Sequence, residues 1–77
     1  MSTNEIADCV RRTLNRYFRD LEGEMPSAIY DMVLKNVEQS MFETVMRHAD
    51  GNQTTAAEML GINRNTLRRK LTEYELL

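Results

Sequence analysis

The chain has 77 residues, of which 42% are hydrophobic and 29% charged, and its formal net charge is −2 at neutral pH. This length accommodates one domain, and such a short domain usually needs a disulfide, a metal or a partner chain for stability. Cys9 is the only cysteine and His48 the only histidine, which excludes an internal disulfide and argues against a zinc site. No apolar stretch could span a bilayer and no signal-peptide pattern is present, so we expect a cytoplasmic protein stabilised by oligomerisation.

The first predicted element is an amphipathic helix over residues 4–21, with Thr3 or Asn4 as its N-cap. Apolar side chains recur in it every three or four residues, and the charged residues lie mostly on the other faces. Gly23 and Pro26 then interrupt the pattern, because glycine suits a helix C-terminus and proline disfavours helical geometry at the residue before it. The apolar positions are Ile6, Val10, Leu14, Tyr17, Phe18 and Leu21.

The second predicted element is a long helix over residues 27–49, whose apolar stripe is too wide for a single packing partner. The shorter helices downstream have little apolar surface to spare. We therefore predict an intertwined homodimer, in which two chains pair their first and second helices into a four-helix centre. Tyr17 and Phe18 are expected in this dimer core, and Cys9 is expected to be a small core residue. The stripe contains Ile29, Met32, Val33, Val37, Met41, Val45 and Ala49, with Tyr30, Leu34, Phe42 and Met46 beside it.

The last third of the chain predicts two short helices, residues 53–60 and 64–74, joined by a tight turn. Asn52 and Asn63 are well suited to cap the first turn of each helix. Gly61 supplies the turn, because glycine adopts positive φ without steric cost. This pattern is typical of a helix-turn-helix.

Small and apolar residues explain how these two helices would pack. Ala56 and Ala57 permit a close crossing, while Leu67 and Leu71 fall on one face of the last helix, and Tyr74 is expected to pack that helix down. We therefore predict an all-α fold of four helices in one domain, 1–77, with dimerisation helices at 3–49 and a helix-turn-helix region at 52–75.

Positive charge is concentrated in the last helix. Residues 1–61 hold six Lys or Arg and ten Asp or Glu, a net charge of −4, whereas residues 62–77 hold four basic and two acidic residues, a net charge of +2. Local charge governs contact with phosphates, because at physiological salt charges more than ~8 Å away are largely screened. Double-stranded DNA is therefore the predicted partner, although the same run of charge is also typical of a solvated helix face.

The geometry of a helix-turn-helix assigns roles to individual polar residues. Arg64 can present a bidentate fork to guanine, Asn63 can pair with adenine or hold a phosphate, and Arg68 lies one turn beyond Arg64. Arg69 and Lys70 flank this face and are interpreted as phosphate contacts. The start of the preceding helix is interpreted as an anion site. The predicted DNA-binding residues are Asn52, Gln53, Thr54, Asn63, Arg64, Thr66, Arg68, Arg69 and Lys70.

Several motifs together resemble the Fis family, the bacterial nucleoid-associated factors for inversion stimulation. They are Gly51-Asn-Gln-Thr, Ala56-Ala57, Gly61-Ile-Asn-Arg64, Thr66-Leu-Arg68 and Lys70-Leu71, with Tyr17-Phe18, Leu34 and Val37-Glu38-Gln39 upstream. The resemblance implies a homodimer whose two helix-turn-helices bind neighbouring major grooves, bend the DNA and compress the minor groove between them. Sequence preference is then degenerate and partly indirect. By position, the family's DNA contacts fall on the nine residues named above, with Asn63 and Arg64 nearest the bases.

Three features depart from the well-studied enterobacterial pattern. Thr72 and Glu73 stand near the C-terminus where that member is more basic, which predicts weaker phosphate binding or a shorter footprint. Asp50 replaces a basic residue linked there to RNA polymerase. The chain also begins almost at the first helix, without the mobile arm that stimulates site-specific invertases. We therefore do not expect a polymerase contact or recombination activity.

Two alternative functions stay open on the sequence. Residues 64–71 also resemble the C-terminal domains of nitrogen-regulator-type enhancer-binding activators, although Met1 and the lack of an ATPase or receiver sequence favour a free-standing protein. The second alternative is a helical dimerisation module that binds protein and not DNA, which charge reversal of Arg64 and Arg68 would distinguish. We predict neither an enzyme nor a cofactor, since there is no glycine-rich nucleotide loop and His48 has no cysteine partner.

Overall fold

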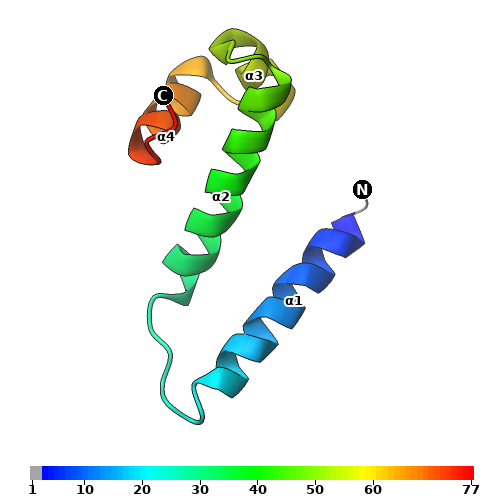
Figure 1. The fold of residues 1–77 in the computed structure, drawn as a ribbon, viewed down its shortest axis with the longest axis vertical. Coiled ribbons are helices and arrows are strands. Elements are labelled where there is room, and N and C mark those ends of the chain that lie inside the picture. The colour runs from blue at the N-terminus through cyan, green and yellow to red at the C-terminus, as the bar shows by residue number, and fades with distance from the viewer. Residues whose placement is uncertain (1–2) are drawn as a thin grey trace.

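The computed structural model describes residues 3–77, and in this range it contains four helices and no strand (Figure 1). The predicted all-α fold is confirmed, and every helix boundary lies within two residues of its predicted position. The helices are α1 (Thr3–Asp20), α2 (Ile29–His48), α3 (Gln53–Leu60) and α4 (Arg64–Glu73).

The start of α1 differs from the prediction. Thr3 and Asn4 are both helical, so neither is the N-cap, and the capping position lies outside the described residues. The start of α2 is two residues later than predicted. Ala28 precedes it with φ 56° and ψ 32°, in the left-handed region that a right-handed helix cannot include.

The turn between α3 and α4 is built as predicted around Gly61, whose φ is 74°. The N–H of Gly61 donates to the carbonyl of Glu58 at 3.2 Å, and the N–H of Ile62 donates to the carbonyl of Ala57 at 3.1 Å. These two bonds form a Schellman motif, which satisfies carbonyl groups that the end of a helix leaves unpaired. The chain direction entering α4 is therefore fixed by hydrogen bonds of the backbone.

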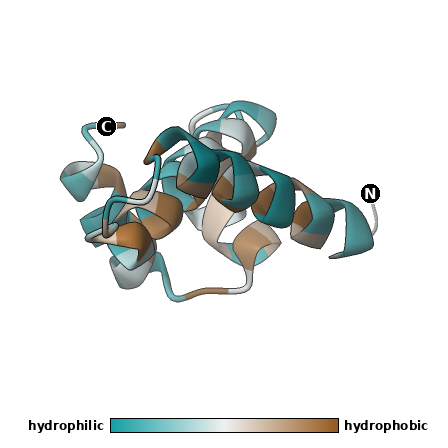
Figure 2. Cartoon of the chain, turned by 90° about the horizontal axis from the view of Figure 1, so that it is seen from below, coloured by the Kyte–Doolittle hydropathy of each residue, from teal (hydrophilic) through white to brown (hydrophobic). Residues whose placement is uncertain are grey.

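The four helices are arranged in two parts (Figure 1). The long helices α1 and α2 lie side by side and run in opposite directions, and α3 and α4 fold back against the C-terminal half of α2. Figure 2 shows that hydrophobic and hydrophilic stretches alternate along the helices, as expected of amphipathic elements. No helix in residues 3–77 is long and apolar enough to cross a membrane.

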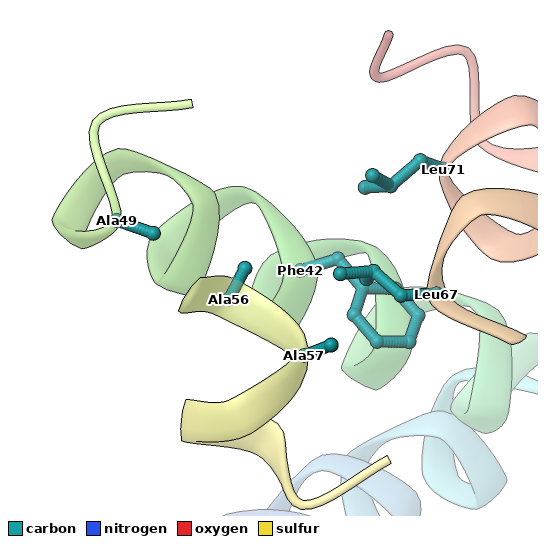
Figure 3. Packing of buried hydrophobic residues seen from close by; sticks show 6 residues of the cluster. All are labelled: Phe42, Ala49, Ala56, Ala57, Leu67 and Leu71. Carbon is teal, nitrogen blue, oxygen red and sulfur yellow. The ribbon is translucent and has the colours of Figure 1, made fainter. Parts of the chain in front are cut away.

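The buried core lies where α2, α3 and α4 meet (Figure 3). Ala56 and Ala57 of α3 are buried, which confirms that small side chains allow the close crossing. Leu67 and Leu71 of α4 are fully buried and point toward α2 and α3, in the same cluster as Phe42. The buried hydrophobic residues of the described chain are Phe42, Ala49, Ala56, Ala57, Leu67 and Leu71.

The other part of the molecule has no such core. Within residues 4–77, α1 and the first half of α2 contain no buried side chain. An apolar groove of about 650 Å³ runs between these helices, which we call the α1–α2 groove; its lining includes Ile6, Val10, Leu14, Val33, Val37 and Met41. The radius of gyration is 15.1 Å, against about 11–12 Å for a compact domain of this length. A single chain is therefore an extended shape with an open apolar face.

Three side chains expected in a core are exposed or half-buried in the single chain. Cys9 is exposed and lines the α1–α2 groove, so the expectation of a core cysteine is wrong for one chain alone. Phe18 is 50% exposed, and its ring meets that of half-buried Tyr17 edge to face, with 6.2 Å between the centroids. The physical reason is that α1 packs against other elements only loosely within residues 3–77, and its sole neighbour α2 is separated from it by the open groove.

Candidate nucleic-acid interface

The N-terminus of α3 is fixed by Asn52, as predicted. Its side-chain oxygen accepts a hydrogen bond from the N–H of Thr55 at 3.1 Å. The other N–H groups of the first turn have no partner within the helix itself, and together they carry partial positive charge. Thr54 is exposed and Gln53 half-buried at this end. The arrangement can hold an anion with backbone and side-chain donors.

The N-terminus of α4 is capped in the same way by Asn63. Its side-chain oxygen accepts from the N–H of Asn65 at 2.7 Å, with φ −67° and ψ 140° at Asn63 itself. Because the oxygen is engaged in the cap, the NH₂ group is the free end of this amide. Asn63 is exposed, so that group can donate to a phosphate or to an acceptor on a base edge.

Three arginines of α4 form the exposed basic surface. Arg64, Arg68 and Arg69 are all exposed, and among residues 3–77 none of them takes part in an ion pair. Arg64 and Arg68 are four residues apart and therefore share one side of the helix. Thr66 of the same helix is half-buried. The arginines present free guanidinium groups, which match guanine edges and phosphates in shape and charge.

Lys70 is placed differently from the three arginines. Its Nζ lies 3.3 Å from Oε1 of Glu38 on α2 and 3.8 Å from Oε2 of Glu73, and its side chain is only 26% exposed. The ammonium group is therefore compensated by two carboxylates of the same chain. Among residues 3–77 the structure leaves Arg64, Arg68 and Arg69 as exposed, unpaired cations, but Lys70 is not one of them.

Tyr74 packs α4 against α2, as predicted. Its ring lies 6.2 Å from that of Phe42, and its hydroxyl donates to Oε1 of Glu38 at 3.1 Å. Desolvation raises the pKa of Tyr74 above 10.0, and the hydrogen bond to Glu38 and the charges of Glu38 and Glu73 raise it further. The phenol therefore stays protonated as a hydrogen-bond donor at neutral pH.

Glu38 is the residue of this region that the sequence motifs did not assign to a role. It lies 32 residues from Lys70 and 36 from Tyr74. No local spacing rule connects positions so far apart. The only sequence feature that relates to this contact is the i, i+4 spacing of Lys70 and Tyr74, which puts both residues on one side of α4.

The described residues contain no cluster of three or more His, Cys, Asp or Glu side chains that could hold a metal ion. The polar groups that the two helix starts and α4 expose are arginine, amide and backbone N–H donors. These are the groups that contact nucleic-acid phosphates and base edges.

Comparison with known proteins identifies the family. The profile of the bacterial regulatory proteins of the Fis family matches residues 33–74, which include most of α2 and all of α3 and α4. The chain belongs to the Fis family. A Fis-like DNA-binding protein of Ralstonia nicotianae is 56% identical over 77 residues, which is the full length of both chains.

Other relatives extend the likeness to several bacteria. A Fis-like DNA-binding protein of Neisseria meningitidis serogroup A is 49% identical over 73 residues, covering 95% of this chain and 92% of the relative. The DNA-binding protein Fis of Glaesserella parasuis is 49% identical over 69 residues, covering 90% of this chain and 70% of the relative. The relatives are named for DNA binding and not for an enzymatic activity. The Fis family resemblance found in the sequence motifs is thereby confirmed.

Proposed function

We propose that this Fis family chain is a homodimeric DNA-binding and DNA-bending protein that acts in the bacterial nucleoid as a transcriptional regulator. The observation that carries the proposal is the exposed set of unpaired arginines, Arg64, Arg68 and Arg69, on a helix held by a buried core. Such a surface attracts polyanions, and a helix-turn-helix presents it to the major groove. The names of the relatives support the same partner.

Within this proposal the polar residues divide into two groups. Arg64 and Arg68 read bases, because they share one side of α4 and a guanidinium can bond to guanine O6 and N7 together. Arg69 and Thr66 bind the sugar–phosphate backbone, as does the NH₂ group of Asn63. At the other helix start, Asn52, Gln53 and Thr54 bind a phosphate with the free N–H groups of α3.

The α1–α2 groove supports dimerisation. It is open, apolar and lined by both long helices, so a second copy of α2 would bury it and complete the four-helix centre expected from the sequence. Covering it removes Val37 and Met41 from water, which are 46% and 41% exposed in the single chain. A small fold with so few buried residues gains much of its stability from such a partner.

Polar side chains along the groove donate hydrogen bonds to backbone carbonyls within α2. The Oγ of Ser40 donates to the carbonyl of Asn36 at 2.8 Å, and the Oγ1 of Thr44 donates to the carbonyl of Ser40 at 2.8 Å. The amide of Asn36 donates in turn to the carbonyl of Met32 at 2.7 Å. Because their single O–H donors are paired, Ser40 and Thr44 can be covered by another helix without leaving an unpaired hydroxyl donor. Asn36, Ser40 and Thr44 are spaced four residues apart and therefore lie along one side of α2, where two copies of the helix can cross closely.

DNA bending follows from the dimer. Two recognition helices on one rigid dimer fit straight DNA only if they are one helical turn apart, about 34 Å. The family resemblance implies a shorter separation, which requires the DNA to bend toward the protein. The bend then favours sequences that deform easily, so recognition is degenerate and depends on the shape of the minor groove.

The testing experiment is a gel shift with salt titration. The probes are a short AT-centred duplex with guanines near its ends and a random duplex of equal length. The proteins are the wild type, Arg64→Ala, and Arg12→Ala, which removes an exposed arginine of α1 as a matched control. We expect the wild type and Arg12→Ala to prefer the designed duplex, with affinity falling steeply as salt rises. Arg64→Ala should lose the preference, which corresponds to about 1–3 kcal/mol for one bidentate base contact.

The other outcomes decide between the remaining functions. If no protein binds either duplex at low salt, the chain is a protein-binding dimerisation module. If the wild type binds but energy transfer across an end-labelled duplex shows that the DNA stays straight, the DNA-binding domain of an enhancer-binding activator becomes the better description. Equal loss of binding in Arg64→Ala and Arg12→Ala would show a diffuse charge effect and contradict the assignment of Arg64 to base readout.

A further inference from the structure

The contact between α4 and the middle of α2 is the feature on which this inference rests. Oε1 of Glu38 accepts two hydrogen bonds from α4, one from Nζ of Lys70 at 3.3 Å and one from the hydroxyl of Tyr74 at 3.1 Å. The Glu38 side chain is 13% exposed, so water competes weakly for these bonds. One carboxylate thus joins two positions of α4 to α2.

The position of Lys70 on α4 separates it from the arginine surface. An α-helix turns by about 100° per residue, so Lys70 lies roughly 160° around the helix from Arg68. Arg68 is exposed, while Lys70 faces α2 and also lies 3.8 Å from Glu73. A phosphate would have to displace two carboxylates to reach this ammonium group.

We propose that Glu38 is a positioning residue for DNA binding, which fixes the angle of α4 on α2 through Lys70 and Tyr74. This inference rests on the proposed function. In the proposed dimer, α2 joins the two subunits, so the angle between α2 and α4 sets the separation of the two recognition helices. That separation determines the bend of the DNA. Lys70 accordingly belongs to the scaffold and does not contact a phosphate.

The test compares the full-length wild type with Glu38→Met, Lys70→Met and the double variant, using Arg69→Met as the matched control. DNA bending is measured by energy transfer across an end-labelled duplex, and affinity is measured over a range of salt. We expect Glu38→Met, Lys70→Met and the double variant to show the same altered bend and a several-fold loss of affinity, with the wild-type salt slope. Arg69→Met should keep the bend and flatten the slope by about 0.9 for each phosphate that the variant no longer neutralises.

A different set of results would show that Lys70 binds a DNA phosphate and that it pairs with Glu38 only in the free protein. In that case Glu38→Met would bind more tightly with a steeper slope, and Lys70→Met would flatten the slope as Arg69→Met does. Either result overturns the proposal, as does a wild-type bend in Glu38→Met. Failure of the wild type to bind any duplex would instead overturn the proposed function, and this inference with it.

A milder variant keeps the test decisive if Glu38→Met does not fold, as judged by circular dichroism. Tyr74→Phe keeps the aromatic ring beside Phe42 and removes only the hydroxyl that donates to Glu38. We expect it to fold and to shift the bend in the same direction as Lys70→Met, by a smaller amount. An unchanged bend in both variants overturns the proposal.

Discussion

Among single residues, side chains with similar chemistry differ in which of their hydrogen-bonding groups remain free. Asn63 uses its carbonyl oxygen to cap α4 and keeps its NH₂ group free. Lys70 and Arg69 are neighbours in one basic run, yet Lys70 is paired with Glu38 and Arg69 is exposed and unpaired among the described residues. A run of positive charge therefore overstates the number of cations that are free to meet DNA.

The Tyr74 hydroxyl gives a pH dependence that can be measured. Its pKa is raised above 10.0 in the folded chain, so folding favours the protonated phenol. The stabilisation is complete below the unfolded value of about 10 and is lost as pH rises through the higher folded value. We expect wild type to be more stable than Tyr74→Phe at pH 8, with the difference shrinking in urea denaturation above about pH 10.

Tyr17 and Tyr30 occur in both proteins, so their ionisation contributes to both denaturation curves and cancels from the difference. A difference that stays constant through the alkaline range would contradict the prediction. It would show that the hydroxyl of Tyr74 contributes nothing to the pH dependence of folding.

At the scale of elements, backbone hydrogen bonds and small residues define the helix-turn-helix. Asn52 and Asn63 cap the two helices, and the Schellman motif at Gly61 links them. Ala56 and Ala57 bring α3 close to the leucines of α4. All of these features depend on neighbours in the sequence, and for this reason α3 was predicted with its observed limits and α4 within one residue.

The turn at Gly61 can be tested by substitution. A Cβ atom at this position would meet nothing within 4 Å, so a substitution acts through the backbone conformation and not through a clash. We expect Gly61→Ala to lower the free energy of unfolding by about 1 kcal/mol, since the left-handed conformation is strained for alanine. Chemical denaturation at fixed protein concentration measures this change.

Asparagine provides the control at the same position, because it tolerates left-handed geometry better than alanine does. Gly61→Asn should therefore lie between wild type and Gly61→Ala in stability. If both variants match the wild type, the turn does not depend on a left-handed residue.

At the largest scale, α2 has two apolar faces. Phe42, Met46 and Ala49 pack with α3 and α4, and Val45 contributes to both faces. The other face lines the α1–α2 groove and has no cover within the described chain. The wide stripe in the sequence is explained by these two faces, of which one is covered within the chain and the other is proposed to meet a second copy.

The groove can be tested with one charged substitution. We expect Val37→Asp to convert the dimer into monomers at micromolar concentration, because the dimer would otherwise bury an unpaired carboxylate. Sedimentation equilibrium measures the change in mass. Met59→Asp is the matched control: this side chain is 56% exposed on α3 and outside the groove lining. A wild type that sediments as a folded monomer would contradict the proposed dimer itself.

Short-range patterns in the sequence were sufficient to predict the helices, the caps at Asn52 and Asn63, the turn at Gly61 and the family motifs, because each depends on residues a few positions apart. Which cations are free depends instead on contacts between helices. Lys70 and Glu38 are 32 positions apart in the chain, and no periodic pattern encodes their pairing. The same holds for the groove between α1 and α2, since its openness depends on how two helices lie in space.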